Sequence, residues 1–180
     1  MKPLADLEKS LGDVFKDAPV LPKGLKDFLV QIAPWAVLLG GIFSLWSAWG
    51  IYKWANTANS FVDYANELSR AYGGDVIETT RWSVSLYISL AILVVIGLIY
   101  LYAFSPLKAM KKQGWDLLFL AMIVNLVYGV VIAFTSYGGF GNLIGTLIGS
   151  VIGAYILFQI RDYYIGKQKV ASKPASPAKK

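Results

Sequence analysis

Residues 140–160 read FGNLIGTLIGSVIGAYILFQI, an apolar run that carries a glycine at every fourth position. The four glycines are Gly141, Gly145, Gly149 and Gly153. In a helix this spacing places them on one stripe, and a stripe without side chains lets the backbone of a second helix approach closely. The segment therefore predicts a membrane-spanning helix with a glycine zipper, a face suited to close helix packing.

Three further segments share the length and the apolar composition of this one. A helix needs about 20 apolar residues to cross the hydrocarbon core of a bilayer, which is about 30 Å thick. Runs of this kind occupy about 34–54, 83–104 and 115–136, besides 140–160. Of the 180 residues, 56% are hydrophobic and only 16% are charged. The chain is therefore predicted to be an all-α integral membrane protein, a four-helix bundle of four spans.

The chain contains no cysteine and no histidine. Thiolate and imidazole zinc sites, disulfides, cysteine nucleophiles and Ser-His-Asp triads are therefore excluded. No Asp, Glu, Lys or Arg lies in the middle of a predicted span, where proton relays and ion paths usually carry one. We therefore expect no catalytic residue, no cofactor and no metal site, and a protein that is not an enzyme.

Basic residues gather on one side of the predicted spans. The loop 137–142 has none, and the loop 55–82 has only Arg70 and Arg81. By the positive-inside rule, the basic side is cytoplasmic, so both termini and the middle loop are predicted to face the cytoplasm of a multi-pass protein of the cell membrane. The basic side carries Lys2, Lys9, Lys16, Lys23, Lys26, Lys108, Lys111, Lys112, Arg161, Lys167, Lys169, Lys173, Lys179 and Lys180.

Residues 1–33 are predicted to form a cytoplasmic amphipathic and interfacial segment. A helical period from residue 3 to residue 16 ends before two prolines, and a second apolar face then leads into the first span. The first helix either packs as a lid on the protein's own cytoplasmic face or binds a partner, and the sequence leaves both open. Its predicted apolar face consists of Leu4, Leu7, Leu11, Val14 and Phe15.

Two other regions outside the spans have distinct compositions. The external loop 55–82 predicts a short amphipathic helix of its own that stops at Gly73-Gly74. Residues 166–180 are mostly Lys, Ala, Ser and Pro, which predicts a disordered basic cytoplasmic tail able to contact anionic lipid. Nucleic acid is disfavoured as a partner because no aromatic residue or arginine is interleaved there.

The first span has a stripe of small residues of its own, Ala36, Gly40, Ser44 and Ala48. Two such stripes on two helices are what a close crossing requires. We expect the first and fourth spans to pack on each other within one chain, since a four-span bundle must satisfy its own contacts. The alternative is that the glycine stripe faces its copy in another subunit. The short connection 136–142 makes the third and fourth spans antiparallel neighbours.

Polar groups within the spans are few. Asn125 lies about halfway along the third span, and Tyr128 follows one turn later. An amide at this depth can hydrogen-bond to a second helix and fix their pairing, which is the interpretation we favour. The alternative is that Asn125 and Tyr128 line a polar path. Asp116, at the cytoplasmic start of the same span, is predicted to cap the helix or to pair with Lys111 or Lys112.

The segment PLKAMKKQGWDLLF, residues 106–119, joins the second and third spans. Together with the polar N-terminal helix, the four spans and the basic tail, it resembles uncharacterised small membrane proteins of bacteria with reduced genomes. The resemblance implies a bacterial cytoplasmic membrane and a four-helix bundle, and it implies no activity.

The function predicted from these features is that of a non-enzymatic membrane scaffold or accessory protein, which acts through helix packing and partner binding. The alternative is a small oligomeric channel or transporter with a polar path near Asn125. The expected partners are the lipid bilayer and either a second copy of the chain or another membrane protein.

Overall fold

The structure is a computed structural model that describes residues 2–75, 84–133 and 139–171. In these ranges the chain is helical and contains no strand. The helices are α1 (Lys2–Val14), α2 (Lys23–Ala71), α3 (Val84–Lys108), α4 (Lys112–Ala133), α5 (Gly139–Gln159) and α6 (Arg161–Ala171). The predicted tight turn between the third and fourth spans and the last nine residues of the predicted tail lie outside the described residues.

Four stretches of helix are long and apolar enough to cross a membrane. They are α2, the segment Leu86–Lys108 of α3, α4, and the segment Gly139–Gly166, which joins α5 to the first turns of α6. The all-helical class and the four candidate spans predicted from the sequence are thus confirmed. The tail prediction is wrong at its beginning, because α6 continues as helix to Ala171.

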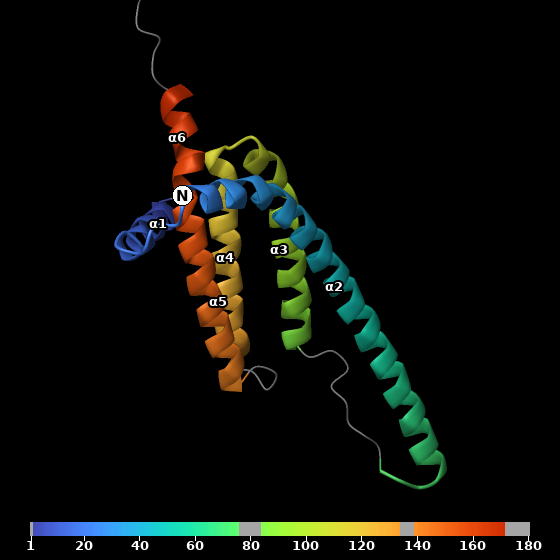
Figure 1. Cartoon of the computed structure of the whole chain (residues 1–180). Coiled ribbons are helices and arrows are strands. Elements are labelled where there is room, and N and C mark those ends of the chain that lie inside the picture. Colours follow the sequence, from blue (N-terminus) through green and yellow to red (C-terminus); the bar gives the residue numbers. More distant parts are fainter. Residues whose placement is uncertain (1, 76–83, 134–138, 172–180) are drawn as a thin grey trace, which may run out of the picture.

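Helix α2 is a single helix of 49 residues. The prediction of a separate external helix is wrong, because residues 55–71 continue the first span without a break. No glycine or proline lies between Gly50 and Gly73, so nothing in this stretch stops the helix. It ends where the sequence predicts, at Gly73, whose positive φ of 71° favours glycine. The buried Pro34 lies in the first third of α2, where the helix bends (Figure 1).

Helices α2, α3, α4 and α5 lie side by side in chain order (Figure 1). Each packs on the next helix in the sequence. In a closed four-helix bundle, the first and last helices of the row would also pack on each other. Among the described residues α2 and α5 do not form such a packed pair, so the row is open. Helices α1 and α6 lie at the same end of the row as the turn between α3 and α4 (Figure 1).

Close approaches between neighbouring helices occur at single glycines. A Cβ on Gly41 of α2 would lie 3.0 Å from the carbonyl oxygen of Gly97 on α3. A Cβ on Gly129 of α4 would collide with the side chain of Thr146 on α5. These two sites set how closely α2 approaches α3 and how closely α4 approaches α5.

The turn between α3 and α4 needs glycine for a similar reason. A Cβ on Gly114 would lie 2.6 Å from the backbone nitrogen of Leu107, which is a steric clash. Only glycine, which has no Cβ, therefore fits at this position. Met110 takes a positive φ of 54° within this turn, and Lys111 donates to the carbonyl of Pro106 at 2.9 Å. The turn therefore brings Leu107 and Trp115 into the same core.

The hydrophobic core lies at the end of the row that holds this turn. Trp115 and Phe119 of α4 stack with their ring centroids 5.3 Å apart. The core also contains Val30, Val37, Ala103, Leu107, Leu157, Ile160 and Tyr164. Away from this end, the helices expose many large apolar side chains, as expected for surfaces that face lipid.

Candidate functional site

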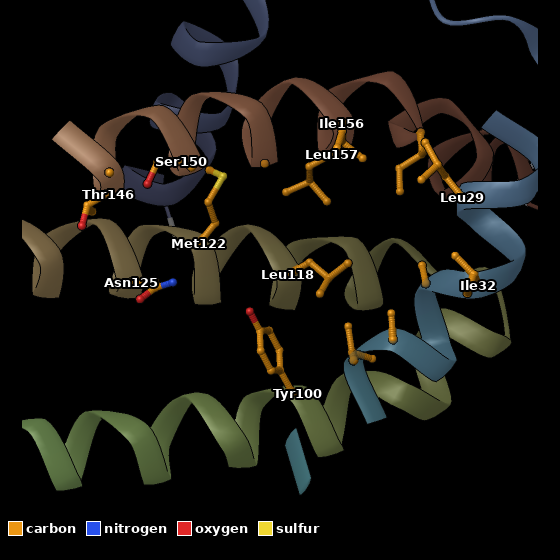
Figure 2. Close-up of a pocket in the computed structure, with 17 residues that line it drawn as sticks. Leu29, Ile32, Tyr100, Leu118, Met122, Asn125, Thr146, Ser150, Ile156 and Leu157 are labelled. Carbon is orange, nitrogen blue, oxygen red and sulfur yellow. The ribbon is translucent and has the colours of Figure 1, made fainter. Parts of the chain in front are cut away.

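An open and largely apolar groove lies between α2 and α5, with α4 and α3 forming its floor (Figure 2). Its volume is about 620 Å³. The wall on the α5 side is made largely of small residues, and the wall on the α2 side comes from the region around Pro34. The lining residues are Leu29, Ile32, Ala33, Ala36, Val37, Tyr100, Leu118, Met122, Asn125, Gly145, Thr146, Gly149, Ser150, Gly153, Ile156, Leu157 and Ile160.

The glycine stripe of α5 faces open space. Gly145, Gly149 and Gly153 line the groove, and a Cβ built on any of them would meet no atom within 4 Å. Gly141, the first glycine of the stripe, is equally open but lies outside the groove lining. The prediction that this stripe packs on the first span of the same chain is therefore wrong.

The small residues of α2 divide between two environments. Ala36 is exposed and lines the groove, whereas Gly40 contacts the ring of Tyr100 and Ala48 is buried. Ser44 donates a hydrogen bond of 2.8 Å to the carbonyl of Leu93 on α3. Gly40 and Ser44 of this stripe thus pack on α3, and Gly97 gives α3 a small position that faces Gly41 and that was not predicted from the sequence.

Four polar side chains line the otherwise apolar groove. Asn125 projects from α4 and Tyr100 from α3 toward the same space, and Thr146 and Ser150 lie on α5 (Figure 2). Asn125 is exposed, and its side-chain amide makes no hydrogen bond to any other described residue, so the predicted bond from this amide to a second helix is absent from the described part of the chain. No ionisable acid or basic amine lines the groove.

Tyr128 lies away from the groove. Its hydroxyl donates to Ser89 Oγ on α3 at 2.8 Å. The two polar residues predicted to share one role are therefore separated: Tyr128 links α4 to α3, and Asn125 faces the groove.

A second feature lies at the core end, where α4 meets α5. The indole of Trp115 has no exposed surface, and its Nε1 donates to the carbonyl of Leu157 at 2.8 Å. Arg161 lies over the same ring, 5.6 Å from its centroid. A tryptophan at the start of an apolar run is typical of an interface anchor, but Trp115 is part of the core.

Helix α1 is docked on the rest of the protein through Glu8. The carboxylate of Glu8, which is 9% exposed, accepts bonds from Arg161 Nη2 at 2.5 Å and from Lys112 Nζ at 3.3 Å. The ring of Phe15 stacks on Phe158 of α5 at 5.6 Å. Helix α1 therefore packs on its own chain, which agrees with the first of the two predicted roles, and binding of a partner by this helix stays a prediction.

The face by which α1 docks differs from the predicted one. Leu7 is 39% exposed and Val14 is 71% exposed, whereas Glu8, Leu11 and Phe15 point inward. The predicted face contained apolar side chains alone. A carboxylate on the same helix can also be buried when two cations bind it, as Arg161 and Lys112 bind Glu8. The side chain of Leu4 lies outside the described ones.

Two smaller contacts complete this end. Lys112 Nζ lies 2.6 Å from Asp116 Oδ1, which confirms the predicted ion pair. Gln159 holds the linker between α1 and α2 by accepting from the Leu21 nitrogen at 3.2 Å and donating to the Pro19 carbonyl at 3.1 Å. The sequence analysis gave Gln159 no role, since nothing local to an amide at a helix end identifies its distant partner.

Among the described residues, no group of three or more acidic, cysteine or histidine side chains could hold a metal ion. Comparison of the chain with protein families, with characterised proteins and with solved structures finds no match.

Proposed function

We propose that the chain is a non-enzymatic integral membrane scaffold or accessory protein, and that its groove between α2 and α5 receives a transmembrane helix. One observation carries this proposal: Gly145, Gly149 and Gly153 line an open groove instead of packing on a helix of their own chain. Between helices in lipid, close packing of small residues replaces the hydrophobic effect as the source of affinity.

The glycine stripe lowers the stability of α5, and contacts within the described part of the chain do not offset this loss. Each glycine inside a helix lowers helix stability by about 1 kcal/mol relative to alanine. Elsewhere in the described part of the chain, Gly41, Gly97 and Gly129 offset this cost through close contacts with a neighbouring helix. A helix placed in the groove would give the stripe of α5 the same kind of contact, with Ala33 and Ala36 facing it from α2.

The proposed topology has four spans with both termini in the cytoplasm. The bias of Lys and Arg toward one side of the predicted spans supports it. So does the location of α1, α6 and the turn between α3 and α4 at one end of the row (Figure 1). The assignment to a bacterial cell membrane rests on the resemblance of residues 106–119 alone.

The test compares two substitutions that add the same bulk. Gly149→Ile fills the groove, whereas Gly50→Ile adds an isoleucine on α2 at a position that is equally open but outside the groove. The first readout is the mass of each protein in lipid nanodiscs. The second is photo-crosslinking in the native membrane, with a photoreactive residue at the exposed Ala36 in the groove or at the exposed Val151, outside it.

We expect Gly149→Ile to fold normally and to lose either the wild-type oligomer or the crosslink formed from Ala36, while Gly50→Ile retains both. Loss of the oligomer identifies a second copy of the chain as the occupant. Loss of the crosslink in a monomeric protein identifies another membrane protein. If the two variants match the wild type in mass and in crosslinks, the groove receives no helix and the proposal fails.

A second candidate function rests on Asn125. Its amide is exposed in the groove beside Thr146, Ser150 and Tyr100, an arrangement that would suit a small oligomeric channel or transporter. Asn125→Leu separates the two functions. A scaffold keeps its partner with a small change in stability, whereas a conducting path loses flux in liposomes. Loss of flux with unchanged assembly would favour the channel over the scaffold.

A further inference from the structure

A second cavity, of about 770 Å³, lies between α1 and the junction of α5 with α6. It is separate from the groove between α2 and α5 and shares no lining residue with it. Helix α1 forms one wall, the first turns of α2 and the linker before it form another, and the ends of α4, α5 and α6 close it.

The cavity wall has a positive charge. Five basic side chains line it against three carboxylates, a net charge of +2. The basic residues are Lys9, Lys16, Lys26, Lys112 and Arg161, and the acidic ones are Glu8, Asp13 and Asp162. A concave surface with an excess of one charge focuses its potential and concentrates ions of the opposite sign.

The basic residues of the wall fall into two groups. Lys112 and Arg161 are held in place by the buried carboxylate of Glu8. Lys9, Lys16 and Lys26 make no ion pair with any residue in the described part of the chain. Within the described residues, three lysines from α1, the linker and α2 therefore face the cavity without an ion-pair partner, as do Asp13 and Asp162, and the wall keeps its net charge of +2.

The same cavity has an apolar side. Phe15 and Phe158, which stack on each other, line it together with Gly12 and Val20. Val20 is 75% exposed. A free inorganic anion would interact only with the cationic side of the cavity. An amphiphile with an anionic head would contact both the cationic side and the apolar side.

From the cationic wall and the adjoining apolar surface, we infer that this cavity binds the phosphate-bearing head group of an anionic phospholipid, with Lys9, Lys16 and Lys26 as its principal cationic contacts. The site lies at the end of the row that carries the basic loops, where the proposed topology places the inner leaflet and its anionic lipids. The inference does not depend on the groove between α2 and α5 or on its occupant.

The test measures the affinity of the purified full-length protein for a fluorescent phosphatidylglycerol. The triple variant Lys9→Gln, Lys16→Gln, Lys26→Gln removes the unpaired lysines of the cavity. The control Lys23→Gln, Lys108→Gln, Lys111→Gln removes the same charge from exposed lysines at the same end of the protein that do not line the cavity. Circular dichroism checks that both proteins fold, and phosphatidylcholine and inorganic phosphate serve as competitors.

We expect the cavity variant to bind phosphatidylglycerol on the order of 100-fold more weakly, because each lysine near an anionic surface contributes roughly a factor of five. The control variant should bind as the wild type does, and neither competitor should displace the lipid. Equal losses in the two variants would overturn the inference, because they would show diffuse attraction. Displacement by inorganic phosphate would overturn the assignment to a lipid, and displacement by phosphatidylcholine would overturn the requirement for an anionic head.

Discussion

The indole of Trp115 lies between α4 and α5, where it makes polar and apolar contacts together. Its Nε1 donates to the Leu157 carbonyl, its ring stacks on Phe119, and it has no exposed surface. An aromatic residue near the end of an apolar run is typical of an interface anchor. The structure instead uses this tryptophan to join two helices, because the preceding turn directs the start of α4 into the core.

Trp115→Phe should lower the free energy of unfolding by about 1 to 3 kcal/mol, since it removes a buried hydrogen bond and leaves the Leu157 carbonyl without its donor. Unfolding in a denaturing detergent, followed by circular dichroism, measures the change. Trp46→Phe is the matched control, because Trp46 is 71% exposed and its replacement should have little effect. Equal stabilities of the two variants would contradict a core role for Trp115.

At the scale of single residues, the sequence indicates contacts between neighbours on one helix better than contacts between residues far apart in the chain. The ion pair of Lys112 with Asp116 was predictable, because residues four apart on a helix are neighbours. The contact of Glu8 with Arg161 joins residues 153 positions apart in the chain, and no local pattern identifies such a pair. The same holds for Gln159 and the linker before α2.

The helices show that glycine can have opposite roles on adjacent elements. On α4, Gly129 sits where a methyl group would collide with Thr146. On α5, Gly145 is next to Thr146 in sequence, yet a methyl group there would meet nothing within 4 Å. Both glycines interrupt apolar helices, and only their surroundings distinguish them.

Gly129→Ala should destabilise the protein by about 1 to 3 kcal/mol, because the added methyl group overpacks the contact between α4 and α5. Gly145→Ala should be neutral or stabilising by up to about 1 kcal/mol, because alanine has the higher helix propensity. Thermal unfolding in one detergent compares the two variants. Destabilisation of the isolated monomer by Gly145→Ala would show that the stripe already packs within the chain.

Docking of α1 should depend on the charge of Glu8. Glu8→Gln replaces the carboxylate that binds Arg161 and Lys112, which should weaken the attachment of α1 by about 1 to 3 kcal/mol. Limited trypsin digestion should then cut faster at Lys16, in the linker between α1 and α2. Asp6→Asn is the control, because Asp6 is exposed on the same helix and should leave the rate unchanged.

Whole elements were predictable from the sequence to a large extent, whereas their packing faces were not. Apolar length identifies four candidate spans, and Gly73 marks the end of α2. Apolar helices of a membrane protein have little amphipathic contrast, so the pattern does not show which side packs and which side faces lipid. From the sequence, the small residues of α2 could pack on α3 or on α5. In the structure α2 packs on α3, where Gly97 permits a close approach.

For the molecule as a whole, the proposed topology leads to a labelling experiment that this chain suits well, since it has no cysteine of its own. A cysteine at Ser10 should react with a membrane-impermeant maleimide only from the cytoplasmic side. A cysteine at Ser60, on the outer part of α2, should react only from outside. Reaction of both from the same side would contradict the proposed four-span topology.

The open row of helices could not be predicted from the sequence, because a closed bundle satisfies the same pattern of lengths and loops. Four apolar helices with short connections are compatible with both arrangements. In the structure, the bend of α2 carries its outer part away from α4 and α5 (Figure 1). Pro34 explains a bend, but the pattern alone does not determine its direction.

The length of α2 has a consequence for the far side of the proposed membrane. At 1.5 Å per residue, 49 residues extend about 74 Å, more than twice the hydrocarbon thickness of about 30 Å. Tilts of membrane helices reach about 40°, which is too little to immerse such a length. Residues 55–71 would therefore form a stiff arm rising about 25 Å beyond the span, with Phe61 and Tyr64 exposed along it. A molecule bound at the tip of this arm would lie at a distance from the membrane that depends on the number of helical turns. Deleting one turn would shorten that distance by about 5.4 Å.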